Sequence, residues 1–89
     1  MIKVVFEFSS ENDFQRINEL IKDSSNSLFE FEGSKNQIIS NEIDPTEEEA
    51  TKRILIAAFK VFINKEIKLT DNVAMLNDIH FGEFTILSI

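Results

Sequence analysis

The strongest constraint on the fold is a helix-compatible segment that is apolar around most of its circumference. Residues 44–66 read DPTEEEATKRILIAAFKVFINKE. At about 100° per residue, one side of such a helix carries Ile54, Ala58 and Val61. A helix that lies on a sheet needs an apolar stripe only somewhat wider than about 100°. We therefore expect the apolar surface beyond that width to be covered by a second copy of the chain or by a partner. The predicted association surface consists of Leu55, Phe59 and Ile63.

The start of this helix carries two competing capping signals. Asp44 can be the N-cap, because the residue before a proline avoids helical angles and Pro45 suits the first helical position. Thr46 together with Glu49 offers a capping box instead. Both alternatives place residues 47–49, all glutamate, in the first turn, where the helix dipole favours negative charge. The sequence predicts a helix over about residues 45–66.

The segments before this helix show clear periodicities. IKVVFEF at residues 2–8 alternates between two faces, as a half-buried strand does. Serines at positions 9 and 10 can cap a one-sided amphipathic helix over residues 11–23. LFEFEGSKNQII at residues 28–39 predicts a hairpin that turns at GSKN.

The last third of the chain leaves an alternative open. Residues 71–80 form either a short third helix, with Val73, Leu76 and Ile79 inward, or an irregular segment, and EFTILSI is the final strand. The order β-α-β-β-α-(α)-β predicts one α+β domain over residues 1–89. We expect a four-stranded, mostly antiparallel sheet with the helices packed on one face, in a ferredoxin-like or related arrangement. The expected core includes Phe6, Phe8, Ile54, Ala58, Val61 and Phe84.

The distribution of charge limits the partners of the chain. The net charge is −7, and residues 1–49 hold twelve acids against four bases, a net charge of −8. An anionic surface repels the phosphates of nucleic acids and membranes, so we expect no direct binding to either. There is no signal-peptide pattern, and the apolar run ILIAAFKVFI is too short to cross a bilayer, so we expect a cytoplasmic protein.

The residues that usually carry catalysis or bind metals are sparse. The chain has no cysteine, and His80 is its one histidine, fewer ligands than a zinc site needs. The same histidine would have to serve any serine triad, and two glycines cannot build a phosphate-binding loop. We therefore expect no catalytic residues, no metal site and no cofactor, and predict that the protein is not an enzyme.

Acidic residues are concentrated around the hairpin and the start of the long helix. If these elements are adjacent, their carboxylates form one anionic surface that imitates a run of DNA phosphates and fits the basic cleft of a nucleic-acid enzyme. The residues predicted to bind such a partner are Glu30, Glu32, Glu42, Asp44, Glu47, Glu48 and Glu49.

The stretch NQIISNEIDPTEEEATKRILIAAFK resembles a segment of small acidic type II-A anti-CRISPR proteins, in which a strand leads through an acidic connection into a helix with an Ala-Phe-Lys ending. The resemblance covers residues 26–64. It implies that Glu42, Asp44 and residues 47–49 imitate phosphates and that the partner is an RNA-guided DNA nuclease. The chain differs from that family by beginning with a strand instead of a helix.

Three functions remain open on the sequence. The first is a phage or mobile-element inhibitor that blocks a nucleic-acid-binding nuclease. The second is an immunity protein that neutralises a basic toxin, whose gene would lie next door. The third is a regulatory or ligand-binding domain that acts as a homodimer. A stable homodimer with no basic partner would favour the third.

Overall fold

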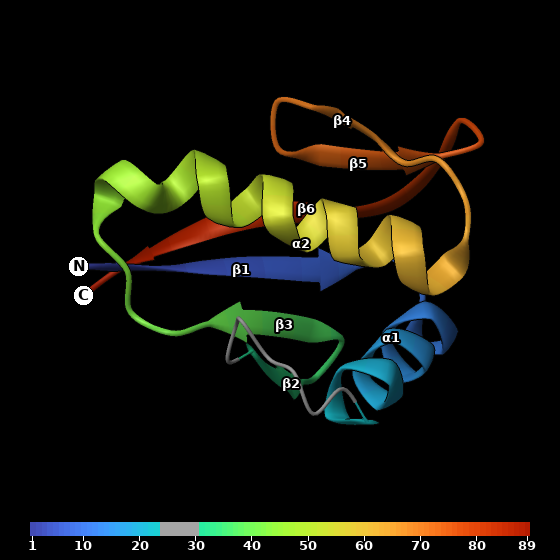
Figure 1. Cartoon of the computed structure of the whole chain (residues 1–89), viewed down its shortest axis with the longest axis horizontal. Helices are drawn as coiled ribbons and strands as arrows, with labels where there is room; N and C mark the ends of the chain where they lie inside the picture. The colour runs from blue at the N-terminus through green and yellow to red at the C-terminus, as the bar shows by residue number, and fades with distance from the viewer. Residues whose placement is uncertain (24–30) are drawn as a thin grey trace.

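The computed structural model describes residues 1–23 and 31–89, whose strands form a six-stranded antiparallel sheet in the order β2-β3-β1-β6-β5-β4 (Figure 1). The strands are β1 (Ile2–Phe8), β2 (Phe31–Ser34), β3 (Gln37–Ser40), β4 (Lys68–Thr70), β5 (Val73–Leu76) and β6 (Ile79–Ser88). The helices are α1 (Glu11–Asp23), the single 3-10 turn η1 (Pro45–Glu47) and α2 (Glu48–Ile63).

The α+β class is confirmed, and the order β2-β3-β1-β6 is the strand order of a ferredoxin-like sheet. The expected number of four strands is wrong, because β4 and β5 extend the sheet beyond β6. Residues 71–80, for which the sequence predicted a third helix or irregular structure, contain β5 and the start of β6, and β4 lies directly before them. The sheet is therefore a split β-α-β arrangement with a hairpin added at one edge.

Backbone angles explain why residues 71–80 do not form a helix. Asp71, Asn77 and Asp78 have φ values of 55°, 52° and 64°, in the left-handed region that ends helices. Asn77 and Asp78 form the two-residue connection between Leu76 and Ile79, which are paired in the ladder. Two consecutive positive φ angles match a type I′ hairpin turn, in which Asn and Asp are favoured. Ile79 consequently points away from the core and is exposed.

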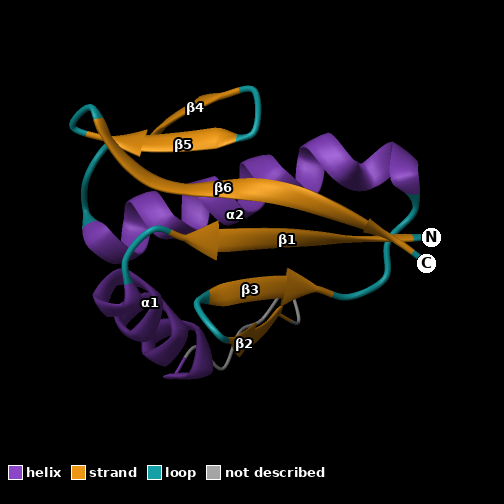
Figure 2. Cartoon of the chain, turned by 180° about the vertical axis from the view of Figure 1, so that it is seen from behind, coloured by secondary structure: helices purple, strands orange, loops and turns teal. Residues whose placement is uncertain are grey.

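Both helices cover the same face of the sheet. The residues of β1 that face the helices are buried, and they pack with Phe14 and Ile17 of α1 and with the buried side of α2. Figure 2 shows the opposite face, where the described residues place no helix in front of β1 and β6. That open face carries Lys3, Val5 and Glu7 from β1 and Thr85 from β6, which are the sides predicted from the alternation in residues 2–8, but Val5 is buried there.

Phenylalanine rings fill the centre of the core. Phe6 lies opposite Phe84 in the ladder between β1 and β6, with ring centroids 4.9 Å apart. Its ring also contacts Phe8 at 4.9 Å and Phe59 of α2 at 5.0 Å. These tilted and edge-to-face contacts are the preferred arrangement of aromatic pairs. The expected core positions Phe6, Phe8 and Phe84 are confirmed as buried.

The orientation of α2 is the reverse of the one predicted. Leu55, Phe59 and Ile63 are buried in the chain's own core, so their expected role as an exposed association surface is wrong. Ile54 and Val61, which were expected in the core, are 37% and 77% exposed. Turning the larger leucine, phenylalanine and isoleucine side chains to the sheet buries more apolar area than turning the alanine-rich side inward.

The ends of α2 also differ from the prediction. The segment Pro45–Glu47 forms a 3-10 turn, and the α-helix begins at Glu48. It ends at Ile63, because Asn64 adopts the left-handed conformation with φ 54° at the C-cap. The helix is therefore shorter than residues 45–66. Ala58, the remaining predicted core residue on this helix, is half-buried.

Candidate acidic interaction surface

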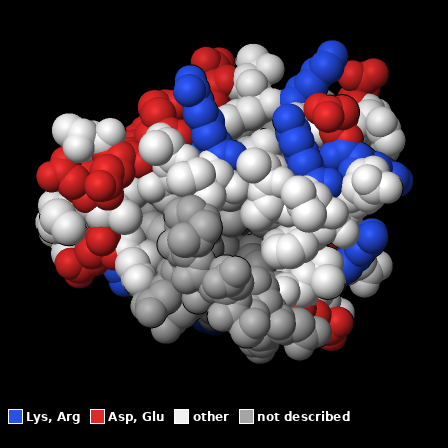
Figure 3. Space-filling view, viewed as in Figure 1, with Lys and Arg blue, Asp and Glu red and all other residues white. Residues whose placement is uncertain are grey.

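Four exposed carboxylates gather where the chain enters α2. We call this set the acidic surface, and it consists of Glu42, Asp44, Glu47 and Glu49. Figure 3 shows acidic side chains concentrated at the left of the molecule, where α2 begins in Figure 1. With Glu48, five of the seven predicted partner-binding residues lie at this end of the helix, and these four of them are exposed.

Asp44 holds the start of this surface in place. Its Oδ1 accepts hydrogen bonds from the backbone N–H of Thr46 at 2.9 Å and from the Thr46 hydroxyl at 2.8 Å. Asp44 is therefore the N-cap of the turn Pro45–Glu47, and the alternative capping box starting at Thr46 does not form. The backbone hydrogen bond and then the hydroxyl hydrogen bond lower the pKa of the Asp44 carboxyl below its ordinary value.

Glu48 is not part of the exposed surface, because Lys52 engages it. The Lys52 ammonium donates to Oε2 of Glu48 at 2.8 Å and to Oδ1 of Asn72, in the turn between β4 and β5, at 2.8 Å. A weaker contact of 3.5 Å reaches Oε1 of Glu49, whose side chain remains 71% exposed. Lys52 itself is 4% exposed. Glu48 is thus a structural carboxylate, and a buried lysine partly neutralises this end of the helix.

The other two residues predicted to bind a partner are Glu32 and Glu30. Glu32 belongs to the edge strand β2, where its backbone is in register with Ile39. Glu30 lies outside the described residues. The predicted merging of the hairpin carboxylates with those of the helix start therefore stays a prediction.

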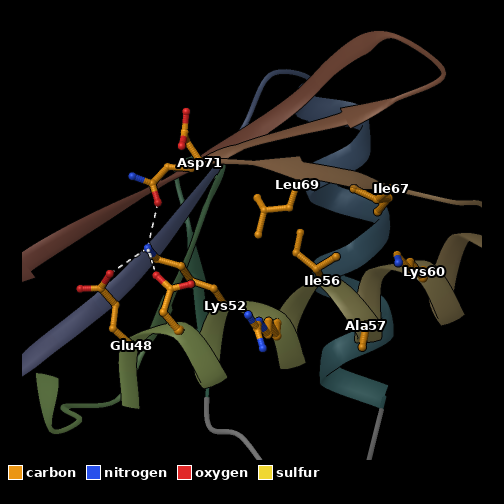
Figure 4. Close-up of a pocket in the computed structure, with 11 residues that line it drawn as sticks. Glu48, Lys52, Ile56, Ala57, Lys60, Ile67, Leu69 and Asp71 are labelled. Carbon is orange, nitrogen blue, oxygen red and sulfur yellow. Dashed lines mark hydrogen bonds and ion pairs between the residues drawn. The ribbon is translucent and has the colours of Figure 1, made fainter. Parts of the chain in front are cut away.

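A groove of about 740 Å³ opens between α2 and β4, next to the Lys52 cluster (Figure 4). Its floor is apolar and is formed by Ile56, Ile67 and Leu69, while Arg53 and Lys60 lie along the helix side. Lys60 also approaches Glu66 at 3.4 Å. The Lys52 cluster at its end is already satisfied by protein partners. The groove therefore brings together apolar and basic groups with the carboxylates of Glu48, Glu49 and Asp71.

The burial of Lys52 was not predicted from the sequence. The spacing of Glu48 and Lys52 is the i, i+4 spacing of a helical ion pair, and this is the signal that was available. The third partner, Asn72, could not be found in the same way. It comes from a hairpin that the sequence did not predict.

His80 pairs with a serine from the far end of the chain. Its Nδ1 and the Ser9 hydroxyl form a hydrogen bond, and both residues are exposed. Among residues 1–23 and 31–89, no group of three or more histidine, cysteine, aspartate or glutamate side chains is arranged to hold a metal ion. In the same part of the chain, no helix has the length and apolar character needed to cross a membrane.

Comparison with known proteins adds no relationship: no family model, curated protein or solved structure matches the chain.

Proposed function

We propose that the protein is a small acidic interaction domain without enzymatic activity, which inserts carboxylates into the basic cleft of a nucleic-acid-binding nuclease and competes there with DNA. The observation that carries the proposal is the acidic surface. Glu42, Asp44, Glu47 and Glu49 are all exposed, and all lie within eight residues of one another. The resemblance to anti-CRISPR proteins supports a phage or mobile-element inhibitor and an RNA-guided DNA nuclease as its target.

The electrostatics of this surface suit a role in binding a protein. Among the described residues, the base that contacts these carboxylates is Lys52, which reaches Glu49 at 3.5 Å but is buried and directed mainly to Glu48 and Asn72. The exposed carboxylates therefore keep most of their field, with which they can steer a basic surface toward the start of α2. Charges at the rim of an interface mainly raise the association rate and specificity, and salt screens them.

An affinity pull-down from the source cells, with identification by mass spectrometry, tests the class of partner. A basic nuclease whose binding is displaced by DNA supports the proposal. A basic toxin with a neighbouring gene supports the immunity function instead. Failure to recover any basic protein contradicts both.

A matched pair of variants tests the surface itself. Glu42→Gln with Glu47→Gln removes two exposed carboxylates from the acidic surface. Glu19→Gln with Glu83→Gln removes two exposed carboxylates from α1 and from the open face of the sheet. Neither pair makes an ion pair or side-chain hydrogen bond within the described residues.

We expect the first double variant to weaken partner binding and inhibition of DNA cleavage several-fold, and the second to leave both nearly unchanged. Melting temperatures measured beside the affinities separate a lost contact from a lost fold. Equal effects of the two pairs would show that net charge, and not the acidic surface, governs binding.

A further inference from the structure

The outward side of α2 carries an apolar stripe that residues 1–23 and 31–89 leave exposed. We call it the α2 stripe, and its members are spaced four, three and four residues apart, so that they lie on one line along the helix. Ile54 is 37% exposed and Val61 77% exposed, and the two alanines between and before them are also exposed. The α2 stripe consists of Ala50, Ile54, Ala57 and Val61.

Charge is distributed unevenly along the same helix. Exposed Glu47 and Glu49 lie at its start, and exposed Arg53 lies in its middle. Lys60 lies in the last turn and Lys65 follows the C-cap, and both are near exposed Glu66, which approaches Lys60 at 3.4 Å, so this end carries two lysines and one glutamate. The charges of these side chains oppose the helix dipole, whose positive end lies at the acidic start of α2 and whose negative end lies at the basic finish. A partner that presents a basic end to the start and an acidic end to the finish of α2 would match both charge groups.

A second copy of α2 in antiparallel orientation meets this requirement. In a two-fold symmetric contact, residue i of one copy faces residue j of the other, and the reverse also holds. When the two-fold axis crosses α2 midway between the levels of Leu55 and Ile56, Ala50 of one copy faces Val61 of the second copy. In the same register, Ile54 faces Ala57. Every larger side chain of the α2 stripe then meets an alanine, which allows the two helices to approach closely.

The same register pairs opposite charges. It places Glu47 of one copy level with Asn64 of the other, one residue before Lys65, and Lys60 level with Thr51, in the turn that carries Glu49. Each contact occurs twice across the two-fold axis. We propose that the protein forms a homodimer in which the α2 stripes of two copies pack antiparallel, with the acidic start of each helix against the basic end of the other.

The homodimer goes beyond the proposed function and does not depend on it. Because Glu47 belongs both to the acidic surface and to the dimer contact, a basic partner and the second copy compete for it. Substitutions of the α2 stripe itself keep the carboxylates of the acidic surface, so they test the dimer separately from the charges on which the proposed function depends.

The first experiment compares two charge insertions by sedimentation equilibrium from micromolar to millimolar concentration. Val61→Glu places a charge in the α2 stripe at a position that is exposed in the single chain. Leu87→Glu places the same charge on the open face of the sheet, where Leu87 is 49% exposed. We expect the unsubstituted chain and Leu87→Glu to have the mass of two chains, and Val61→Glu the mass of one.

Three outcomes would overturn the proposal: an unsubstituted chain that stays monomeric throughout, a Val61→Glu variant that stays dimeric, or dissociation by Leu87→Glu alone. The last would place the contact on the open face. Circular dichroism of both variants confirms that each is folded before its mass is interpreted.

The second experiment tests orientation by charge exchange. Glu47→Lys alone places two lysines together at each end of the contact, and Lys65→Glu alone places two glutamates together. Each variant should dimerise at least tenfold more weakly than the unsubstituted chain. A mixture of the two variants pairs lysine with glutamate at both ends, so native mass spectrometry should find the heterodimer predominant. A mixture that forms no heterodimer would exclude the antiparallel arrangement.

Discussion

The ammonium group of Lys52 donates a hydrogen bond of 2.8 Å to Oδ1 of Asn72, a residue twenty positions further along the chain. Through this contact the second turn of α2 is joined to the turn between β4 and β5. Glu48 binds the same ammonium group from the helix side. The side chain is buried and its polar atoms are satisfied, so the cluster connects the added hairpin to the rest of the fold.

Replacement of Lys52 by methionine should destabilise the protein. The apolar stem is kept, but the hydrogen bonds to Glu48 and Asn72 are lost, at a net cost of about 0.5–1.5 kcal/mol each, because water can reach both partners once the ammonium group is gone. Urea denaturation measures the change as a shift of the midpoint. Lys60→Met is the matched control, because its 3.4 Å contact with Glu66 is largely exposed and should contribute less than about 0.5 kcal/mol. Similar costs for the two variants would contradict the structural role of Lys52.

Two neighbouring positions on α2 test the observed orientation of the helix. Phe59→Ala should cost about 3–5 kcal/mol, because the ring is fully buried against Phe6 and Phe8. Val61→Ala should change the free energy of unfolding by less than about 0.5 kcal/mol in the monomer, because the side chain is exposed. Chemical denaturation of both variants at low protein concentration gives the comparison. A larger cost at Val61 would restore the orientation predicted from the sequence.

Gly82 should not tolerate a side chain. A Cβ at this position would lie 2.5 Å from Cζ of Phe6 and 2.4 Å from the carbonyl oxygen of Glu7. Backbone cannot move aside without disturbing the ladder between β1 and β6, so Gly82→Ala should cost about 1–3 kcal/mol through overpacking. Thermal denaturation measures the loss, and Thr85→Ala on the open face serves as the control. A Gly82→Ala variant as stable as the unsubstituted chain would contradict the close approach of Phe6.

Asp44 should make stability depend on pH in the acid range. Its pKa is lower in the folded protein than in the unfolded chain, so its stabilising contribution is fully present above the unfolded value, near about 4. The contribution is lost as pH falls through the lower folded value. Asp44→Asn keeps a capping side chain but has no charge to titrate. Its melting temperature should therefore decrease less between pH 5 and pH 2 than that of the unsubstituted chain; equal decreases would contradict the role of the Asp44 carboxylate.

The elements with a single clear periodicity could be predicted from the sequence. The alternation in residues 2–8 identified β1 and its buried face, and the narrow stripe of residues 11–23 identified α1. The turn in GSKN was also found, where Lys35 and Asn36 both have positive φ. In each case one face is distinctly apolar, so burying it determines the orientation of the element.

The orientation of α2 could not be obtained in this way. A helix that is apolar nearly all round has no unique buried face. Which of its sides turns toward the sheet therefore depends on tertiary packing. Phe59 fits beside Phe6, and the neighbouring hairpin accepts Lys52. Both contacts join segments far apart in sequence. The hairpin itself was misread because spacing by threes at Val73, Leu76 and Ile79 imitates a helix, whereas Asn77 and Asp78 determine the turn.

The candidate site was predicted in part. The residues at the helix start are adjacent in sequence, so their clustering follows from the local structure alone. Which of them remain available was not predictable, because the selection depends on the buried lysine. Lys52 binds Glu48, whereas Glu42, Asp44, Glu47 and Glu49 stay exposed, although Asp44 also accepts hydrogen bonds from Thr46.

The pairing of β1 with β6 has a consequence for how the chain folds during synthesis. Ile2 is in register with Ser88, so the two central strands are among the first and last segments of these residues to be made. Until β6 emerges from the ribosome, β1 can pair with β3 but has an unpaired edge on its other side, next to an incomplete core. Such long-range pairing slows folding and leaves a strand edge open to other chains. We therefore expect this domain to complete its core only after translation of β6.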